Sequence, residues 1–180
     1  MRKEIFQKIK IPEGVEAEIV GNTLIIKGKE GENKRKFNIA DLVFEKRNDE
    51  IVLGSENATK KEKKKINTFA AHIKNMIKGV QEKFEYTLKA CYSHFPITIE
   101  VQGDKAIIKN FLGEKSPRIV KIPKGIEIDV DREIIKIKSV NKELAGMAAT
   151  NFEKATKIRK KDRRIFQDGI YMTNKAGREI

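Results

Sequence analysis

Residues 20–28 read VGNTLIIKG, and residues 102–110 read QGDKAIIKN. Each stretch places a Gly-Asn or Gly-Asp turn shortly before an Ile-Ile-Lys run, and the second stretch begins 82 positions after the first. The similarity continues without a gap to the Gly-Glu pairs at 31–32 and 113–114. Because similar elements follow in the same order in both halves, the sequence predicts two tandem copies of one unit.

A second similarity relates residues 9–15, IKIPEGV, to residues 120–126, VKIPKGI. Their offset of 111 positions differs from that of the duplication, and only the offset of 82 is followed by the same order of elements. We therefore interpret this pair as two independent uses of one strand–turn–strand pattern, in which Pro and Gly supply the turn.

Each half opens with short runs rich in Ile and Val, separated by Gly-Asn, Gly-Asp or Pro-x-Gly turns. Partly alternating β-branched runs between turn residues are typical of antiparallel strands. The expected strands span residues 15–20, 23–27, 51–53, 97–101, 106–109, 126–130 and 134–137.

Each half then changes to spacings of three and four residues, which place apolar side chains on one face of a helix. The expected faces are Ile66, Phe69, Ala70, Ile73, Ile77 and Val80 in the first half, and Leu144, Ala148, Phe152 and Ala155 in the second. Caps are available at Asn57 or Thr59 for the first helix, which we expect to end at Gly79, and at Ser139 or Asn141 for the second.

The predicted fold class is α+β, with two tandem duplicated domains that are each an antiparallel β-sheet packed against one α-helix. Residues 1–82 are expected to form the N-terminal repeat domain. Residues 83–180 are expected to form the C-terminal repeat domain, which carries a basic extension that the first copy lacks.

The composition limits the classes of function. Among 180 residues, 39 are Lys or Arg and 26 are Asp or Glu, which gives a formal net charge of +13. This balance favours RNA, DNA or an anionic membrane surface as partner, although a Lys-rich surface can also serve solubility alone. With one cysteine and two histidines we expect no internal disulfide, no metal site and no cofactor. The N-terminal MRKEIF lacks a signal-peptide pattern and no apolar run is long enough to span a membrane, so we expect a soluble cytoplasmic protein.

Two cationic clusters concentrate the charge. Residues 60–65 read KKEKKK and open the first expected helix. Lys near a helix N-terminus is unfavourable to the helix dipole, so helix propensity does not explain this run. It is either a solvated helix face or a contact for RNA or another acidic surface.

The second cluster, residues 154–164, reads KATKIRKKDRR and contains seven Lys or Arg residues opposed only by Asp162. It leads into IFQDGIY at residues 165–171. Arg side chains form bidentate contacts with phosphate. The apolar neighbours indicate a segment held by the domain at one end and by a polyanion at the other, and the alternative is a frayed basic tail.

Three motifs resemble a known family. They are YSHFPI at residues 92–97, NFLGEK at 110–115 and RKKDRRIFQDGIY at 159–171. In order and spacing they are similar to the universal large-subunit ribosomal protein family L-six, in its archaeal and eukaryotic form (L-nine in eukaryotes). The duplication extends this resemblance over the whole chain.

The resemblance implies a structural constituent of the large ribosomal subunit that binds large-subunit (23S-type) rRNA mainly through the C-terminal domain. It also implies a place near the stalk base and the sarcin–ricin region, with neighbouring large-subunit proteins and translational GTPases nearby. Carried onto this sequence, the RNA-binding residues are Lys157, Arg159, Lys160, Lys161, Arg163, Arg164, Gln167, Asp168, Gly169 and Tyr171, with Tyr92, His94 and Phe95 as further contacts.

These residue types suit RNA, because aromatic and His side chains stack on unpaired bases while Lys and Arg hold phosphates. Each also has a structural alternative. Tyr92 and Phe95 could pack in the core, His94 could make a structural hydrogen bond, and Gly169 could serve a turn.

Other classes of function fit less well. Cys91 and His94 could form a nucleophilic pair, but three positions apart in a strand they would lie on opposite faces, so we expect no catalytic residues, no enzyme and no small-molecule substrate. A stand-alone RNA-binding protein is the nearest alternative, although the basic–aromatic signature of an RRM and the ligands of a zinc finger are missing. Membrane binding is not expected, because the apolar helix faces are needed to cover sheets.

Overall fold

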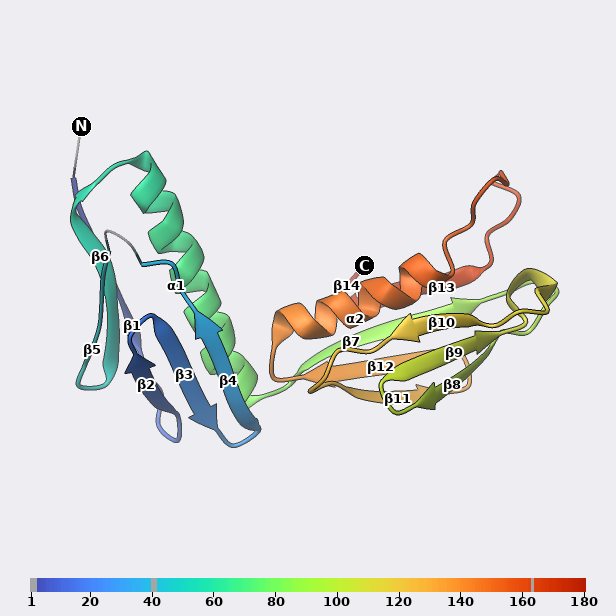
Figure 1. Cartoon of the computed structure of the whole chain (residues 1–180), viewed down its shortest axis with the longest axis horizontal. Helices are drawn as coiled ribbons and strands as arrows, with labels where there is room; N and C mark the ends of the chain where they lie inside the picture. The colour runs from blue at the N-terminus through green and yellow to red at the C-terminus, as the bar shows by residue number, and fades with distance from the viewer. Residues whose placement is uncertain (1–2, 40–41, 163) are drawn as a thin grey trace. The chain divides into compact units, whose positions relative to one another are not determined.

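The computed structural model describes residues 3–39, 42–162 and 164–180, and the chain divides into two compact units, Met1–Lys83 and Phe84–Ile180 (Figure 1). This division falls beside the boundary expected from the duplication. Each unit combines antiparallel sheets with one long helix. The predicted α+β class is therefore confirmed.

The first unit packs one helix against two sheets. Its elements are β1 (Lys3–Lys10), β2 (Glu16–Val20), β3 (Thr23–Gly28), β4 (Gly31–Lys36), β5 (Val43–Arg47), β6 (Glu50–Ala58) and α1 (Lys60–Gln81). The strands form two three-stranded antiparallel sheets in the orders β1-β6-β5 and β2-β3-β4. Helix α1 contacts strands of both sheets, and its Ile66, Ile73 and Val80 side chains are fully buried.

Helix α1 begins with a capping box. The Thr59 side chain accepts a hydrogen bond from the Lys61 N–H, and the Glu62 carboxylate accepts one from the Thr59 N–H at 2.8 Å, so the cap is Thr59 and not Asn57. The predicted end at Gly79 is wrong. Gly79 does not adopt a positive φ, and the helix continues past it to Gln81 because the Glu82 N–H still donates to the Lys78 carbonyl.

The second unit repeats this plan and adds a hairpin. Its elements are β7 (Phe84–Cys91), β8 (Thr98–Gln102), β9 (Lys105–Lys109), the short turn η1 (Phe111–Gly113), β10 (Arg118–Lys121), β11 (Glu127–Asp131), β12 (Ile134–Ser139), α2 (Lys142–Ala155), β13 (Gly169–Lys175) and β14 (Arg178–Glu179). They form the sheets β10-β9-β8 and β11-β12-β7-β13-β14. Helix α2 packs across β7, β10, β12 and β13 (Figure 1), and its cap is Asn141, whose side chain accepts from the Glu143 N–H at 2.9 Å.

The duplication extends to hydrogen-bond register. Glu16 pairs with Lys27 in the first unit, and Thr98 pairs with Lys109 at the equivalent place in the second. The Gly-Glu pairs at residues 31–32 and 113–114, however, do not occupy equivalent places in the two units. Ile26 faces Asn33, seven positions away, whereas Ile108 faces Arg118, ten positions away. The three additional residues lengthen the β9–β10 connection, which contains η1.

Among the described residues, strands β13 and β14 have no counterpart in the first unit. Within the same residues β1 pairs with β6 alone and is a sheet edge, whereas its counterpart β7 pairs with both β12 and β13. Each unit also holds two sheets where the sequence indicated one. The similarity at an offset of 111 is local, because residues 9–15 connect β1 to β2 while residues 120–126 connect β10 to β11.

Candidate nucleic-acid interface

The cationic segment forms a loop between α2 and β13. We call residues 157–168 the basic loop. Thr156, which is buried, closes its base: its hydroxyl donates to the Phe152 carbonyl at 3.3 Å and accepts from the Ile170 N–H at 2.9 Å. The Glu153 carboxylate adds a second tie by accepting from the Met172 N–H at 3.1 Å. Both ends of the segment are therefore held by the domain, which corrects the expectation that the domain holds it at one end only and excludes a frayed tail.

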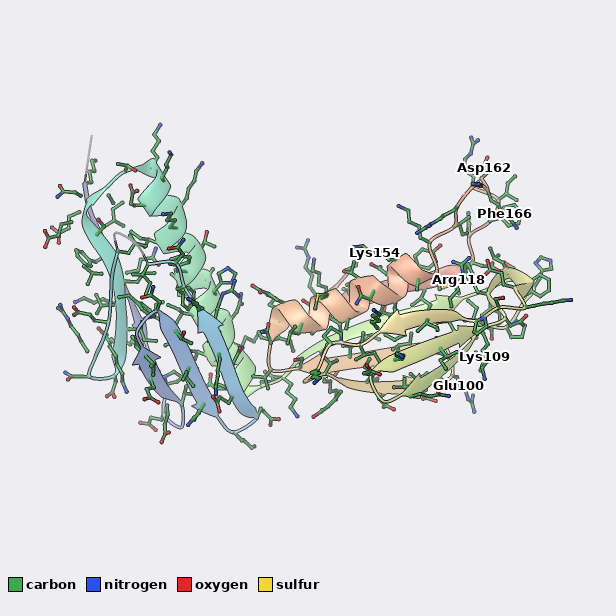
Figure 2. The ribbon with its side chains drawn as sticks, viewed as in Figure 1. Glu100, Lys109, Arg118, Lys154, Asp162 and Phe166 are labelled. Carbon is green, nitrogen blue, oxygen red and sulfur yellow. The ribbon has the colours of Figure 1, made fainter. Side chains whose placement is uncertain are left out.

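Asp162 organises the tip of the basic loop, which projects beyond α2 (Figure 2). Its carboxylate accepts from the Arg164 N–H at 2.9 Å and pairs with the Arg164 guanidinium at 3.0 Å. These hydrogen bonds, first from the side chain and then from the backbone of Arg164, lower the pKa of the Asp162 carboxyl. The one acid in the cluster thus shapes the turn and leaves the other described cations of the loop exposed.

The basic loop is joined to the YSHFPI motif by a buried carboxylate. Asp168 is 8% exposed, and it accepts a hydrogen bond from the Ser93 N–H at 3.2 Å. That contact brings together two motifs that are 75 positions apart in the sequence. Asp168 was predicted to contact RNA; in the structure it is buried, and its carboxylate also holds the two loops together through the Ser93 N–H.

The NFLGEK motif joins the same region. The Asn110 side chain donates to the Pro96 carbonyl at 3.1 Å. Gly113 adopts a positive φ of 73°, and a Cβ there would lie 3.2 Å from the Phe95 ring, so this ring packs over the Gly113 backbone. All three motifs identified in the sequence therefore meet at one end of the second unit.

A cleft of about 590 Å³ lies between the basic loop and the β9–β10 connection. Its lining residues include Lys154, Lys157, Arg159, Lys161, Glu114 and Arg118. The Arg118 guanidinium binds Glu114 at 2.5 and 2.8 Å, donates to the Ala155 carbonyl at 2.7 Å and lies 4.3 Å from the Phe111 ring centroid. Because Arg118 neutralises Glu114, four cations set the charge of this cleft, which we call the cationic cleft.

Most of the predicted RNA-binding residues are accessible. In the basic loop the exposed ones are Lys157, Arg159, Lys160, Lys161, Arg164 and Gln167, followed in β13 by Tyr171. Arg163 lies outside the described residues. Gly169 is buried and opens β13 instead of forming a turn; a Cβ there would lie 3.1 Å from the Tyr171 ring. Its lack of a side chain therefore makes room for that ring.

The aromatic and His residues of the YSHFPI motif are exposed as well. Phe95 is 46% exposed and Tyr92 36% exposed, so neither is a core residue, and His94 also lies at the surface. The Tyr92 hydroxyl donates to Glu133 at 2.9 Å, and this hydrogen bond raises the pKa of the Tyr92 hydroxyl. Cys91 ends β7, whereas His94 lies beyond the strand.

The structure adds three residues to the predicted set: Arg118, Lys154 and Phe166. The Lys161 ammonium lies 4.5 Å from the Phe166 ring centroid, and Figure 2 shows Lys154 at the end of α2 beside the loop. Lys154 belonged to the cationic cluster and Phe166 to the apolar run that follows it. Arg118 had no local signal, because only folding brings β10 against the loop.

Within the described chain, no helix is long and apolar enough to cross a membrane. Among the described residues, no group of three or more His, Cys, Asp or Glu side chains is placed to hold a metal ion.

Two tandem copies of one α+β unit, the second modified by a basic loop and an added hairpin, define a duplicated α+β protein with one specialised copy. The family model of ribosomal protein L6 matches residues 11–83 and 95–169, one segment in each unit. The chain therefore belongs to the ribosomal protein L6 family, and the resemblance drawn from its motifs is confirmed.

Curated relatives match over nearly their whole length. The chain is 43% identical over 176 residues to large ribosomal subunit protein uL6 of Methanosarcina mazei, covering 98% of this chain and all of that protein. It is 42% identical over 171 residues to the uL6 protein of Methanobrevibacter smithii, covering 95% and 96%. The uL6 protein of Methanothrix thermoacetophila is 39% identical over 175 residues, covering 97% and 99%.

Proposed function

We propose that the chain is a structural constituent of the large ribosomal subunit and binds large-subunit rRNA mainly through its second unit. Its membership of the ribosomal protein L6 family makes it a ribosomal protein, a component of the ribonucleoprotein that carries out translation. The proposed role is binding, without a catalytic step, and its place is in the cytoplasmic ribosome beside other large-subunit proteins.

The observation that carries this proposal is the meeting of three distant motifs at the end of the second unit that also holds the cationic cleft. Lys154, Lys157, Arg159 and Lys161 line one cleft, and each can neutralise a phosphate and release a counterion. The exposed rings of Tyr92 and Phe95 lie in the adjoining motif, where they can stack on unpaired bases. A cleft with phosphate-binding side chains beside exposed aromatics suits folded RNA better than regular duplex.

The finer location is supported by the family resemblance alone. We propose that the second unit lies near the stalk base and the sarcin–ricin region, so that translational GTPases dock nearby. The exposed Lys60, Lys61 and Lys63 at the start of α1 are left to solvent or a secondary acidic contact in this arrangement.

Co-sedimentation tests the proposal. The chain, added to large subunits depleted of it by high salt, should sediment with them at physiological salt and be released only at high salt. Fractionation of cells at moderate salt should likewise place it with large subunits. A chain that binds RNA fragments but stays out of the large-subunit fraction would instead be a stand-alone RNA-binding protein.

A further inference from the structure

A pocket of about 300 Å³ lies beneath the basic loop, on the side facing β13. Ile158 and Ile170 are buried in its lining, and the exposed rings of Phe166 and Tyr171 also border it. A pocket of this volume is at the lower end of the range for small-ligand sites, which are about 300–1,000 Å³. The pocket is therefore large enough for one small chemical group.

The pocket and the cationic cleft adjoin each other. Lys154, Lys157 and Ile158 line both of them. Lys161 lines the cleft while Phe166 lines the pocket, and the Lys161 ammonium lies 4.5 Å from the Phe166 ring centroid. An apolar, aromatic pocket thus shares its border with a strongly cationic cleft.

Contacts within the loop hold the Tyr171 side chain and the Phe166 backbone. The Tyr171 hydroxyl donates to the Gln167 carbonyl at 2.9 Å, and the Tyr171 ring packs against Gly169, where a Cβ would approach it to 3.1 Å. The Phe166 N–H donates to the Asp162 carbonyl at 2.9 Å. The carboxylate at the pocket, Glu153, is engaged by the Met172 N–H.

We propose that this pocket binds a single unpaired RNA base, while the phosphates on either side of that nucleotide bind Lys154 and Lys157. The inference rests on the proposed function and narrows it to a bulged or looped-out nucleotide. Charge complementarity selects the occupant: an uncharged apolar ligand would make no use of the two lysines, whereas a nucleotide presents an aromatic plane between two anions. Base–aromatic stacking tolerates any base, so the pocket selects an unpaired nucleotide before it selects a sequence.

The test compares two RNA hairpins that differ by one bulged adenosine in an otherwise identical paired stem, with the full chain as the protein. The wild type should bind the bulged hairpin roughly tenfold more tightly, since stacking of one base contributes an effect of that order. Phe166→Ala should abolish this preference, because it should lower affinity for the bulged hairpin about tenfold more than affinity for the paired hairpin. Gly169→Ala, which would displace the Tyr171 ring, should reduce the preference.

Phe6→Ala is the matched control, because Phe6 in the first unit has the same exposure as Phe166, 37%. It should retain the full preference. If Phe166→Ala also lowers affinity for the paired hairpin, crosslinking decides: a 5-iodouridine bulge should crosslink to Phe166 or Tyr171 in the wild type. A crosslink confined to other residues would overturn the pocket assignment.

Different results would overturn the base-binding pocket and the rRNA-binding role. Equal affinity of the wild type for both hairpins, with steep salt dependence, would overturn the base-binding pocket and leave the rRNA-binding role intact. A full chain that binds neither hairpins nor large subunits would overturn the proposed function, and the pocket assignment with it.

Discussion

The backbone N–H of Ser93 donates a hydrogen bond of 3.2 Å to the buried carboxylate of Asp168. This contact joins the loop after β7 to the end of the basic loop. It places the exposed ring of Phe95 and the exposed cations of the basic loop in one region. An acidic residue within a basic signature thus has a hydrogen-bond partner inside the protein.

Replacing Asp168 should therefore destabilise the protein. Asp168→Ala leaves the Ser93 N–H without its acceptor in this part-buried contact, and a hydrogen bond to a charged group contributes about 1.5–3 kcal/mol. We expect a decrease of this order in the free energy of unfolding measured by urea denaturation. Asp168→Asn keeps an acceptor oxygen and should lose less. Equal stability of all three proteins would show that the contact does not position the loops.

The Glu114–Arg118 pair should make stability depend on pH. Hydrogen bonding to Arg118 lowers the pKa of the Glu114 carboxyl below its usual 4.5, against a smaller opposing effect of burial. A lowered pKa in the folded state stabilises the protein above the unfolded pKa, and this contribution is lost as the pH falls through the folded pKa. Wild type should thus exceed Glu114→Gln in unfolding free energy at pH 7, and the difference should shrink below pH 4.5.

Arg118→Lys supplies the control for this effect, since Lys cannot form the two-pronged contact with a carboxylate. In that background Glu114→Gln should change the pH profile less. A pH profile of Glu114→Gln that parallels the wild type throughout would contradict the role given to the pair.

Two glycines should respond in opposite directions to alanine. A Cβ at Gly28 would lie 2.8 Å from the Val80 carbonyl oxygen, where α1 packs on β3, so Gly28→Ala should cost about 1–3 kcal/mol through overpacking. Gly146 lies inside α2, and a Cβ there would lie 3.4 Å from the hydroxyl of Tyr86 in β7, which is an ordinary van der Waals distance. Gly146→Ala should therefore stabilise the protein by about 0.5–1 kcal/mol. Chemical denaturation measures both, and matching signs would contradict the packing described.

The contribution of each unit to RNA binding can be tested by separating the two units. Residues 83–180 alone should bind an rRNA fragment from the large subunit, and residues 1–82 alone should bind it poorly, because the cationic cleft belongs to the second unit. Circular dichroism must first show that each fragment is folded. Tighter binding by residues 1–82 would move the RNA-binding face to the α1 lysines.

The sequence allowed much of the fold to be predicted, because the duplication repeats apolar spacings and turn residues that are local signals. Strands such as β3 and β9, and both helices, follow from them. Strands β4 and β13 were not predicted. The sequence of β4, GENKRK, is polar, and that of β13, GIYMTNK, follows directly on the basic segment; both become strands through pairing with β3 and β7.

Most residues of the candidate site could be predicted from the sequence, but the contacts that bring them together could not. Cationic residues from 157 to 164 were visible as a cluster. The closure of the loop by Thr156 and the cleft wall formed by Arg118 depend on contacts between residues 14 and 37 positions apart. Burial of Asp168 and Gly169 likewise could not be read from the motif, because it depends on the contact of Asp168 with Ser93 and the pairing of Gly169 with Cys91, both far away in the sequence.

The salt dependence of rRNA binding is the most direct measure of whether the basic loop binds phosphates. Five phosphate contacts predict a slope of about −3.5 to −4.5 for the logarithm of affinity against the logarithm of salt concentration. Changing Lys157, Arg159, Lys160 and Lys161 to Gln should reduce the magnitude of this slope by about 3, while changing Lys60, Lys61, Lys63 and Lys64 to Gln should leave it unchanged. An unchanged slope in the first variant and a flattened slope in the second would contradict the account.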